Sequence, residues 1–99
     1  MIVEYSPENG LYLVDPFDFR RFKLVLKGEL DVGSAASKGI SLVDNDNALI
    51  PIELVPTLPG RPNESTWESD YAKMVASAGK HGWIDAKTNA IRVHVERQS

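Results

Sequence analysis

The sequence predicts a single α+β domain over residues 1–99, with a mostly antiparallel sheet built from hairpins and two helices packed on one face of that sheet. Three observations support this prediction. A short polar run that ends in Gly or Asn, with apolar residues on both sides, occurs three times in the 99 residues. Between these turns lie two stretches whose apolar residues recur at helical spacing. A chain of this length buries one core, so the predicted element order is ββα-ββα-ββ within one domain.

Residues 2–14 (IVEYSPENGLYLV) predict the first hairpin. Pro7 supplies the φ angle that the second position of a turn needs, and Gly10 takes the positive φ that closes a type I turn with a bulge. The expected register places Tyr5 opposite Tyr12 as a cross-strand aromatic pair. Both tyrosines are candidate ligand-binding residues.

Residues 16–27 (PFDFRRFKLVLK) predict the first helix. Asp15 is the expected N-cap, Pro16 the first helical residue and Gly28 the stop. A helical wheel gathers three basic side chains on one side, where they are candidate contacts for an anion or an acidic partner: Arg20, Lys23 and Lys27. Because FKLVLK also alternates with period two, a strand is the alternative at this place.

Residues 40–55 (ISLVDNDNALIPIELV) predict the second hairpin. Pro51 has no N–H to donate to a sheet, so the second strand is expected at an edge or at a bulge. The stretch before this hairpin, residues 32–39 (VGSAASKG), is compatible with a short helical turn.

The second helix is expected between a capping box, Ser65 with Glu68, and a terminating Gly79. Its apolar residues recur on one face at helical spacing: Trp67, Tyr71, Met74, Val75 and Ala78. Because burial of a large side chain stabilises a fold by roughly 1.5 to 3 kcal/mol, we expect the two aromatic residues to anchor this helix to the sheet.

The third hairpin is predicted over residues 84–96, with a loop at residues 86–89 and Asn89 in the left-handed conformation. If the register continues past Ile84, His81 lies opposite His94, and Trp83 lies opposite Arg92 on the polar face. These four side chains are the main candidate ligand-binding residues: His81, Trp83, Arg92 and His94. Two imidazoles alone make a weak metal site, so no metal is predicted, and a bulge at Gly82 would separate the pair.

Composition excludes several classes of function. The sequence has no cysteine, which excludes disulfides and thiol nucleophiles. Its net charge is -3, from 11 Lys and Arg against 14 Asp and Glu, so no nucleic-acid partner is expected. No secretory leader is expected, because the first residues have neither its basic nor its apolar part, and no apolar run approaches the ~20 residues of a membrane span. We therefore expect a soluble cytoplasmic protein without a membrane partner.

Neither a Ser-His-Asp order nor a nucleotide-binding or metal-binding signature is present in the sequence. The leading prediction is therefore a small noncatalytic interaction or ligand-binding module, which forms a homodimer through its edge strands and takes a small-molecule or protein partner. No cofactor and no catalytic residue are assigned. The alternative is a small enzyme or enzyme subunit, with a pocket between sheet and helices that uses His81 or His94 for acid-base chemistry.

Overall fold

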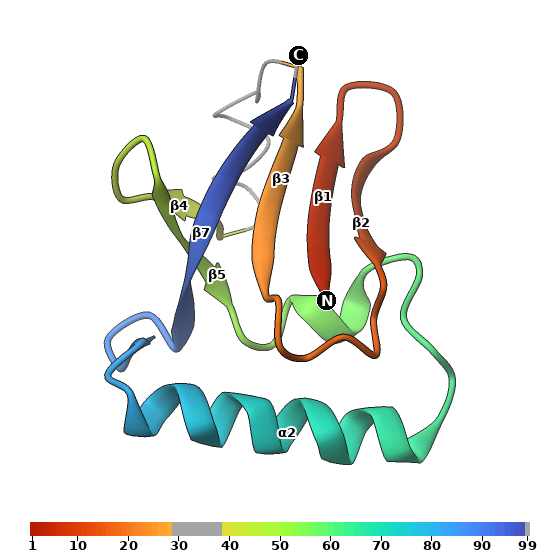
Figure 1. Ribbon diagram of the computed structural model, residues 1–99, viewed down its shortest axis with the longest axis vertical. Coiled ribbons are helices and arrows are strands. Elements are labelled where there is room, and N and C mark those ends of the chain that lie inside the picture. Colours follow the sequence, from red (N-terminus) through yellow and green to blue (C-terminus); the bar gives the residue numbers. More distant parts are fainter. Residues whose placement is uncertain (29–38, 99) are drawn as a thin grey trace.

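The computed structural model describes residues 1–28 and 39–98. Within these residues, seven strands form one sheet in the order β2-β1-β3-β7-β5-β4, and β6 pairs with β7 beside this path. Figure 1 shows the sheet with α2 lying across one of its ends. The elements are β1 (Ile2–Ser6), β2 (Gly10–Val14), β3 (Lys23–Lys27), β4 (Ser41–Leu42), β5 (Asn47–Pro51), the 3-10 helix η1 (Val55–Thr57), α2 (Ser65–Lys80), β6 (Ile84–Asp85) and β7 (Ala90–Gln98).

The predicted arrangement of two helices on a mostly antiparallel sheet is wrong. The described residues hold one α-helix, and the sheet is mixed, because β3 runs parallel to both β1 and β7. The remaining neighbours are antiparallel. An α+β arrangement remains, with a parallel centre that hairpins alone cannot produce. The helical turn predicted at residues 32–39 falls almost wholly outside the described residues.

The first predicted helix is the main error, and its strand alternative is correct. Lys23–Lys27 forms β3, in which Leu24, Val25 and Leu26 are all buried. A continuous apolar run is typical of a strand that is buried on both of its faces. Asp15, the expected helix cap, instead takes a left-handed φ of 48°.

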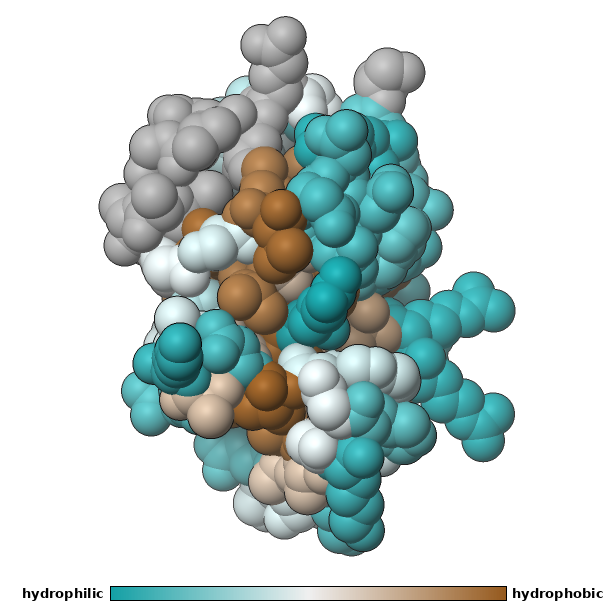
Figure 2. All heavy atoms as spheres, turned by 90° about the vertical axis from the view of Figure 1, so that its left-hand side faces the viewer, coloured by the Kyte–Doolittle hydropathy of each residue, from teal (hydrophilic) through white to brown (hydrophobic). Residues whose placement is uncertain are grey.

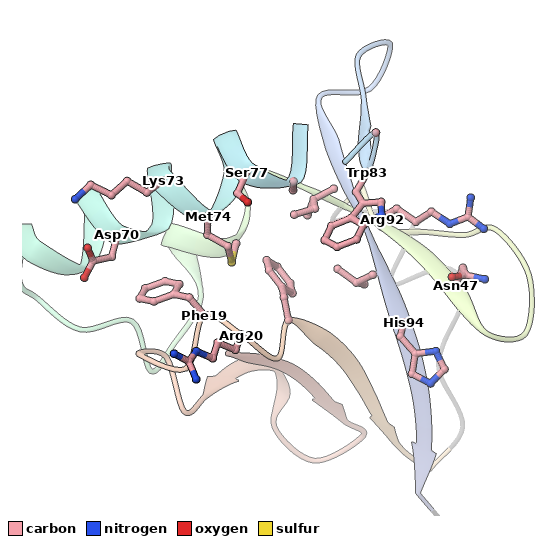
Figure 3. A pocket seen from close by; sticks show the side chains of 15 residues that line it. Phe19, Arg20, Asn47, Asp70, Lys73, Met74, Ser77, Trp83, Arg92 and His94 are labelled. Atoms are coloured by element: carbon pink, nitrogen blue, oxygen red, sulfur yellow. The ribbon is translucent and has the colours of Figure 1, made fainter. Parts of the chain in front are cut away.

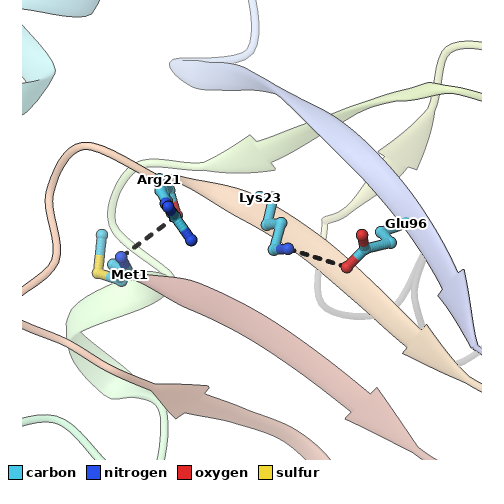
Figure 4. A network of polar contacts seen from close by, with 4 residues as sticks. All are labelled: Met1, Arg21, Lys23 and Glu96. Atoms are coloured by element: carbon cyan, nitrogen blue, oxygen red, sulfur yellow. Dashed lines mark hydrogen bonds and ion pairs between the residues drawn. The ribbon is translucent and has the colours of Figure 1, made fainter.

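The loop of residues 15–22 makes the parallel centre possible. It leaves β2 and passes beneath the start of β1 before it enters β3 on the other side (Figure 1). The Met1 amino group donates hydrogen bonds to the Asp18 carbonyl oxygen and, at 3.3 Å, to the Arg21 carbonyl oxygen, the second of which is drawn in Figure 4. Burial of this amino group lowers its pKa. The start of β1 is therefore held by the loop that crosses it.

The first hairpin is confirmed, but its register is shifted by one residue. Gly10 takes the expected positive φ of 69°, yet it pairs with Ser6. Tyr5 therefore faces Leu11, while Tyr12 faces Glu4. The two tyrosines lie on opposite faces of the sheet, because successive side chains of paired strands alternate between faces. The predicted aromatic pair is wrong.

The second hairpin joins β4 to β5 as predicted. Pro51 is the last residue of β5 and pairs with Ala90 of β7. The described β4 pairs only with Ala48 and Leu49. Pro51 thus lies at the end of β5, beyond the residues that pair with β4, where its missing N–H costs no ladder hydrogen bond. β5 itself lies between β7 and β4, so the predicted placement of this strand at an edge is wrong.

The third hairpin has the predicted loop, and Asn89 has a left-handed φ of 51°. Asp85 faces Ala90 and Ile84 faces Ile91, as expected. The pairing does not reach the histidines, since α2 continues to Lys80 and His81 is its C-cap. His94 instead lies between Asn47 of β5 and Lys23 of β3. The predicted His81–His94 pair is wrong.

α2 begins and ends at other residues than predicted. Its N-cap is Glu64, which makes no side-chain capping bond, so the capping box is wrong, and the helix runs past Gly79 to Lys80. The predicted apolar stripe is confirmed in that Trp67, Tyr71 and Ala78 are buried.

Two aromatic residues of α2 hold it against the rest of the chain. The Trp67 Nε1 donates to the Pro16 carbonyl oxygen at 2.8 Å, and the Tyr71 hydroxyl donates to the Ile52 carbonyl oxygen at 2.8 Å. Their rings stack with centroids 5.2 Å apart. Burial raises the pKa of the Tyr71 hydroxyl, which keeps it a hydrogen-bond donor.

The core lies on one face of the sheet. Val3, Leu24 and Val95 are neighbours across β1, β3 and β7, and all three are buried. Val55 of η1 and Leu58 join the same apolar cluster. The connector that contains η1 therefore belongs to the core.

Replacement of Trp67 by alanine should destabilise the fold by about 3 to 5 kcal/mol, the range for removing a large buried aromatic side chain. Trp67 is 0% exposed, whereas Trp83 is 51% exposed, so Trp83→Ala is the matched control and should cost less than about 1 kcal/mol. Chemical denaturation measures both values. Similar losses in the two variants would contradict the anchoring role of Trp67.

Gly60 is expected to tolerate alanine less well than Gly10. Both have positive φ angles, but a Cβ on Gly60 would lie 2.5 Å from the Leu13 carbonyl oxygen, whereas one on Gly10 meets nothing within 4 Å. Gly10→Ala should cost about 1 to 2 kcal/mol from the left-handed backbone alone, and Gly60→Ala should cost more. Urea denaturation of the two variants compares them, and equal losses would contradict the close approach of Gly60 to β2.

Candidate functional site

A pocket of about 800 Å³ lies between α2, β7 and the loop of residues 15–22. We call it the α2–β7 pocket. From its sixth residue onward, α2 presents one side to this pocket, with residues at the i, i+3, i+4, i+7 and i+8 positions of a helical face: Asp70, Lys73, Met74, Ser77 and Ala78. Trp67 and Tyr71, in the N-terminal half of α2, hold the helix in place beside the pocket.

The pocket opens where β7 changes its partner. The Arg92 N–H donates to the Trp83 carbonyl oxygen at 2.7 Å, which is the last bond toward the β6 side. Parallel pairing with β3 begins at His94, opposite Lys23. Between these two points, the edge of β7 that pairs with β6 and then with β3 has a break, while its other edge stays paired with β5. Both of its faces therefore reach the pocket: Ile91 and Val93 from the core face, and Arg92 and His94 from the polar face.

The interior of the α2–β7 pocket is apolar. Phe19 and Phe22 come from the loop, Met74 from α2 and Val93 from β7. Figure 3 shows Met74 of α2 pointing toward Phe19 of the loop, with Arg20 beside Phe19. Aromatic rings and a flexible thioether form a surface that suits a flat apolar molecule.

The rim carries an excess of positive charge. Among the described residues, Arg20, Lys73 and Arg92 line it together with one carboxylate, Asp70, so their formal excess is two positive charges. None of these three cations forms an ion pair with another described residue. The rim thus differs in sign from the whole chain, whose net charge is -3.

Trp83 stands at the rim with its ring stacked on His81, and the ring centroids are 4.7 Å apart. The His81 Nδ1 lies 2.9 Å from the Ser77 carbonyl oxygen and donates to it. His81 itself does not line the pocket. It supports Trp83 from the side, because the stack and the hydrogen bond to α2 orient both rings.

The predicted candidate residues divide into those that line the pocket and those that do not. The structure brings together four of them: Arg20, Trp83, Arg92 and His94. His81 touches the group through Trp83. Tyr5 and Tyr12 belong to the β1–β2 hairpin and do not line the pocket.

The predicted basic stripe does not exist, because its residues do not share a helix. Lys23 forms an ion pair with Glu96 at 2.9 Å (Figure 4) and lowers the pKa of that carboxyl group. Lys27 pairs with Glu4 at 2.5 Å, and this contact raises the pKa of Lys27. Only Arg20, which precedes β3, reaches the α2–β7 pocket.

Sequence reasoning missed the residues that α2 adds to the site. The periodic signal was present, since Asp70, Lys73 and Ser77 recur beside Met74 and Ala78 at helical spacing. Because the whole apolar stripe is expected to face the core, the polar residues beside it are not recognised as site residues. The polar residues along one border of that stripe indicate that the C-terminal half of the helix lines a wet surface.

The chain matches no protein-family model, and searches of curated proteins and of solved structures found no similar protein. Among the described residues, no helix has both the length and the apolar character needed to cross a membrane. The functional argument therefore rests on the geometry of the pocket.

Asn47 is oriented at the rim by the turn that precedes it. Its side-chain amide donates to the Asp44 carboxylate at 3.0 and 3.2 Å, and the Asp46 amide donates to the same group at 2.8 Å. These bonds hold the pKa of Asp44 below its ordinary value of 3.8.

Acid should therefore weaken the β4–β5 turn through Asp44. A carboxyl group whose pKa is lower in the folded state stabilises the fold fully above its unfolded pKa, and this contribution is lost as the pH falls through the folded value. Asp44→Asn, which cannot titrate, should be less stable than the wild type near neutral pH, and the difference in stability should shrink as the pH falls below about 3.9. Urea midpoints across this range test the expectation. A difference that stays constant with pH would contradict it.

Proposed function

We propose that the protein is a noncatalytic module that binds a small molecule with an apolar body in the α2–β7 pocket. The observation that carries the proposal is the pocket itself, which has a volume of about 800 Å³ and an aromatic interior beneath a polar rim. Ligand sites of about 300 to 1,000 Å³ with this distribution of apolar and polar groups are typical of small-molecule binding.

The contacts that fix α2 against the sheet support a preformed binding site. Trp67 and Tyr71 anchor one half of the helix through hydrogen bonds and stacking. The other half presents Met74, whose flexible side chain adapts to ligand shape. A rigid frame with one adaptable wall reduces the ordering that binding requires.

The alternative of a small enzyme remains, with His94 as its acid-base residue, because His94 lines the pocket. A general base works best when a second group orients its ring. Among the described residues, no hydrogen-bond partner of the His94 ring is present. Binding is the leading proposal because of the apolar interior of the pocket.

Self-association and a cytoplasmic location belong to the same proposal. Leu42 and Val43 are exposed at the β4 edge of the sheet, and Figure 2 shows an apolar band between hydrophilic surfaces on the side of the molecule that carries β4 and β5. Exposed apolar side chains at a strand edge favour pairing with a second copy. Native mass spectrometry reports the dimer, and a monomer at all concentrations would remove this part of the proposal.

A neutral fluorescent probe, N-phenyl-naphthylamine, should bind the wild-type protein in the pocket. Met74→Trp places a larger ring in the interior and should weaken binding at least about tenfold. Ala76→Trp is the matched control, because Ala76 is exposed on the same helix and does not line the pocket. It should bind the probe as the wild type does. Fluorescence titration measures all three affinities.

Absence of probe binding to the wild type, or equal weakening in the two tryptophan variants, would overturn the proposed function. Thermal melting of both variants shows that each is folded before the comparison is made.

A further inference from the structure

We infer that the ligand of the α2–β7 pocket is an organic monoanion, a flat apolar body that carries one carboxylate or sulfonate-like group, and that Arg20 binds this group. The inference rests on the proposed function and adds the chemical class of the ligand to it.

The charge of the rim supports an anion. In the part of the chain that the structure describes, Arg20, Lys73 and Arg92 outnumber the carboxylate of Asp70 at the rim, although the chain as a whole has a net charge of -3. Positive charge is therefore concentrated at this opening against the overall balance. A cluster of one sign in a cleft attracts ligands of the opposite sign, because the apolar walls focus its field.

Arg20 is the best placed of these cations. It follows Phe19 in the loop, and Figure 3 shows it beside the Phe19 ring, at the border between the apolar interior and the rim. A ring bound against Phe19 and Met74 would place its acidic group near this guanidinium. A planar guanidinium binds a carboxylate through two parallel hydrogen bonds, which a lysine cannot do.

Arg92 is less available. Figure 3 shows it extended toward Asn47, away from Phe19 and Met74. Its charge also acts on the Asp44 carboxylate of the same turn and contributes to the lowered pKa of that group. The positive charge of Arg92 is thus partly offset by the Asp44 carboxylate.

Asp70 limits the charge of the ligand. It lines the same part of the rim as Lys73, one helical turn along α2, so the two side chains offset one another and leave Arg20 as the net charge there. A dianion such as a phosphate would meet repulsion from Asp70 without a second free cation beside it. One positive charge fits a single negative charge.

The experiment compares two probes with the same apolar body. Anilinonaphthalene sulfonate carries one negative charge, and N-phenyl-naphthylamine is its neutral counterpart. The wild type should bind the sulfonate at least about tenfold more tightly than the neutral probe. Added salt should weaken binding of the sulfonate and leave that of the neutral probe unchanged.

Arg20→Gln should remove most of this preference, with neutral-probe binding retained as proof of an intact pocket. Arg21→Gln is the matched control, because Arg21 is the exposed neighbour of Arg20, carries the same charge and does not line the pocket. It should keep the preference. Naphthoate should displace the sulfonate more effectively than naphthyl phosphate does.

The outcomes separate the two proposals. Equal affinity of the wild type for both probes would overturn the anion inference, while the pocket and its Met74→Trp effect would stand. Equal losses in Arg20→Gln and Arg21→Gln would overturn the assignment to Arg20. Failure of the wild type to bind the neutral probe would overturn the proposed function, and the inference would fall with it.

Discussion

The fold depends on the burial of Trp67 at the point where three parts of the chain meet. Its ring is wholly buried and stacks on Tyr71, and its indole N–H is bound to the Pro16 carbonyl oxygen. Pro16 belongs to the loop that crosses the start of β1, and the Tyr71 hydroxyl is bound just after β5, at Ile52. One stacked pair thus ties α2 to both halves of the sheet. The indole and phenol satisfy buried carbonyl groups there, which an aliphatic residue of similar size could not do.

This anchoring also explains where the pocket lies. Because the N-terminal half of α2 is held down, its C-terminal half passes over the place where β7 exchanges β6 for β3. β6 comprises only Ile84 and Asp85, since the helix continues to Lys80 and leaves few residues for a longer strand. A longer β6 would pair further along β7 and close the break. The length of α2 therefore determines whether the sheet has an opening.

The sequence predicts the turns of this fold well and its pairing poorly. Gly10 and Asn89 take the left-handed conformations expected of them, because turn chemistry is local and depends on a few residues. The sequence favours a helix at β3 because a short apolar run fits a strand and a helix equally, and the parallel partners that decide between them are distant in sequence. The one-residue error in the register of the first hairpin has a similar origin. Whether Gly10 belongs to the loop or to the strand is decided by pairing along the whole of β1.

In the candidate site, too, the residues that depend on local structure are predicted from it, while the positions of the others depend on distant contacts. Trp83 and Arg92 follow from the local register of the third hairpin, and the bond between their backbones confirms that they are neighbours. Arg20 lines the pocket although the helix on which it was predicted does not exist, so its identification did not depend on a correct local structure. Its position is set by the crossing of residues 15–22 beneath β1, a contact between segments that no periodic pattern records. A pocket built at a break in pairing collects residues from distant segments. Its local signals are limited to the register of the third hairpin and to the polar border of the otherwise apolar face of α2.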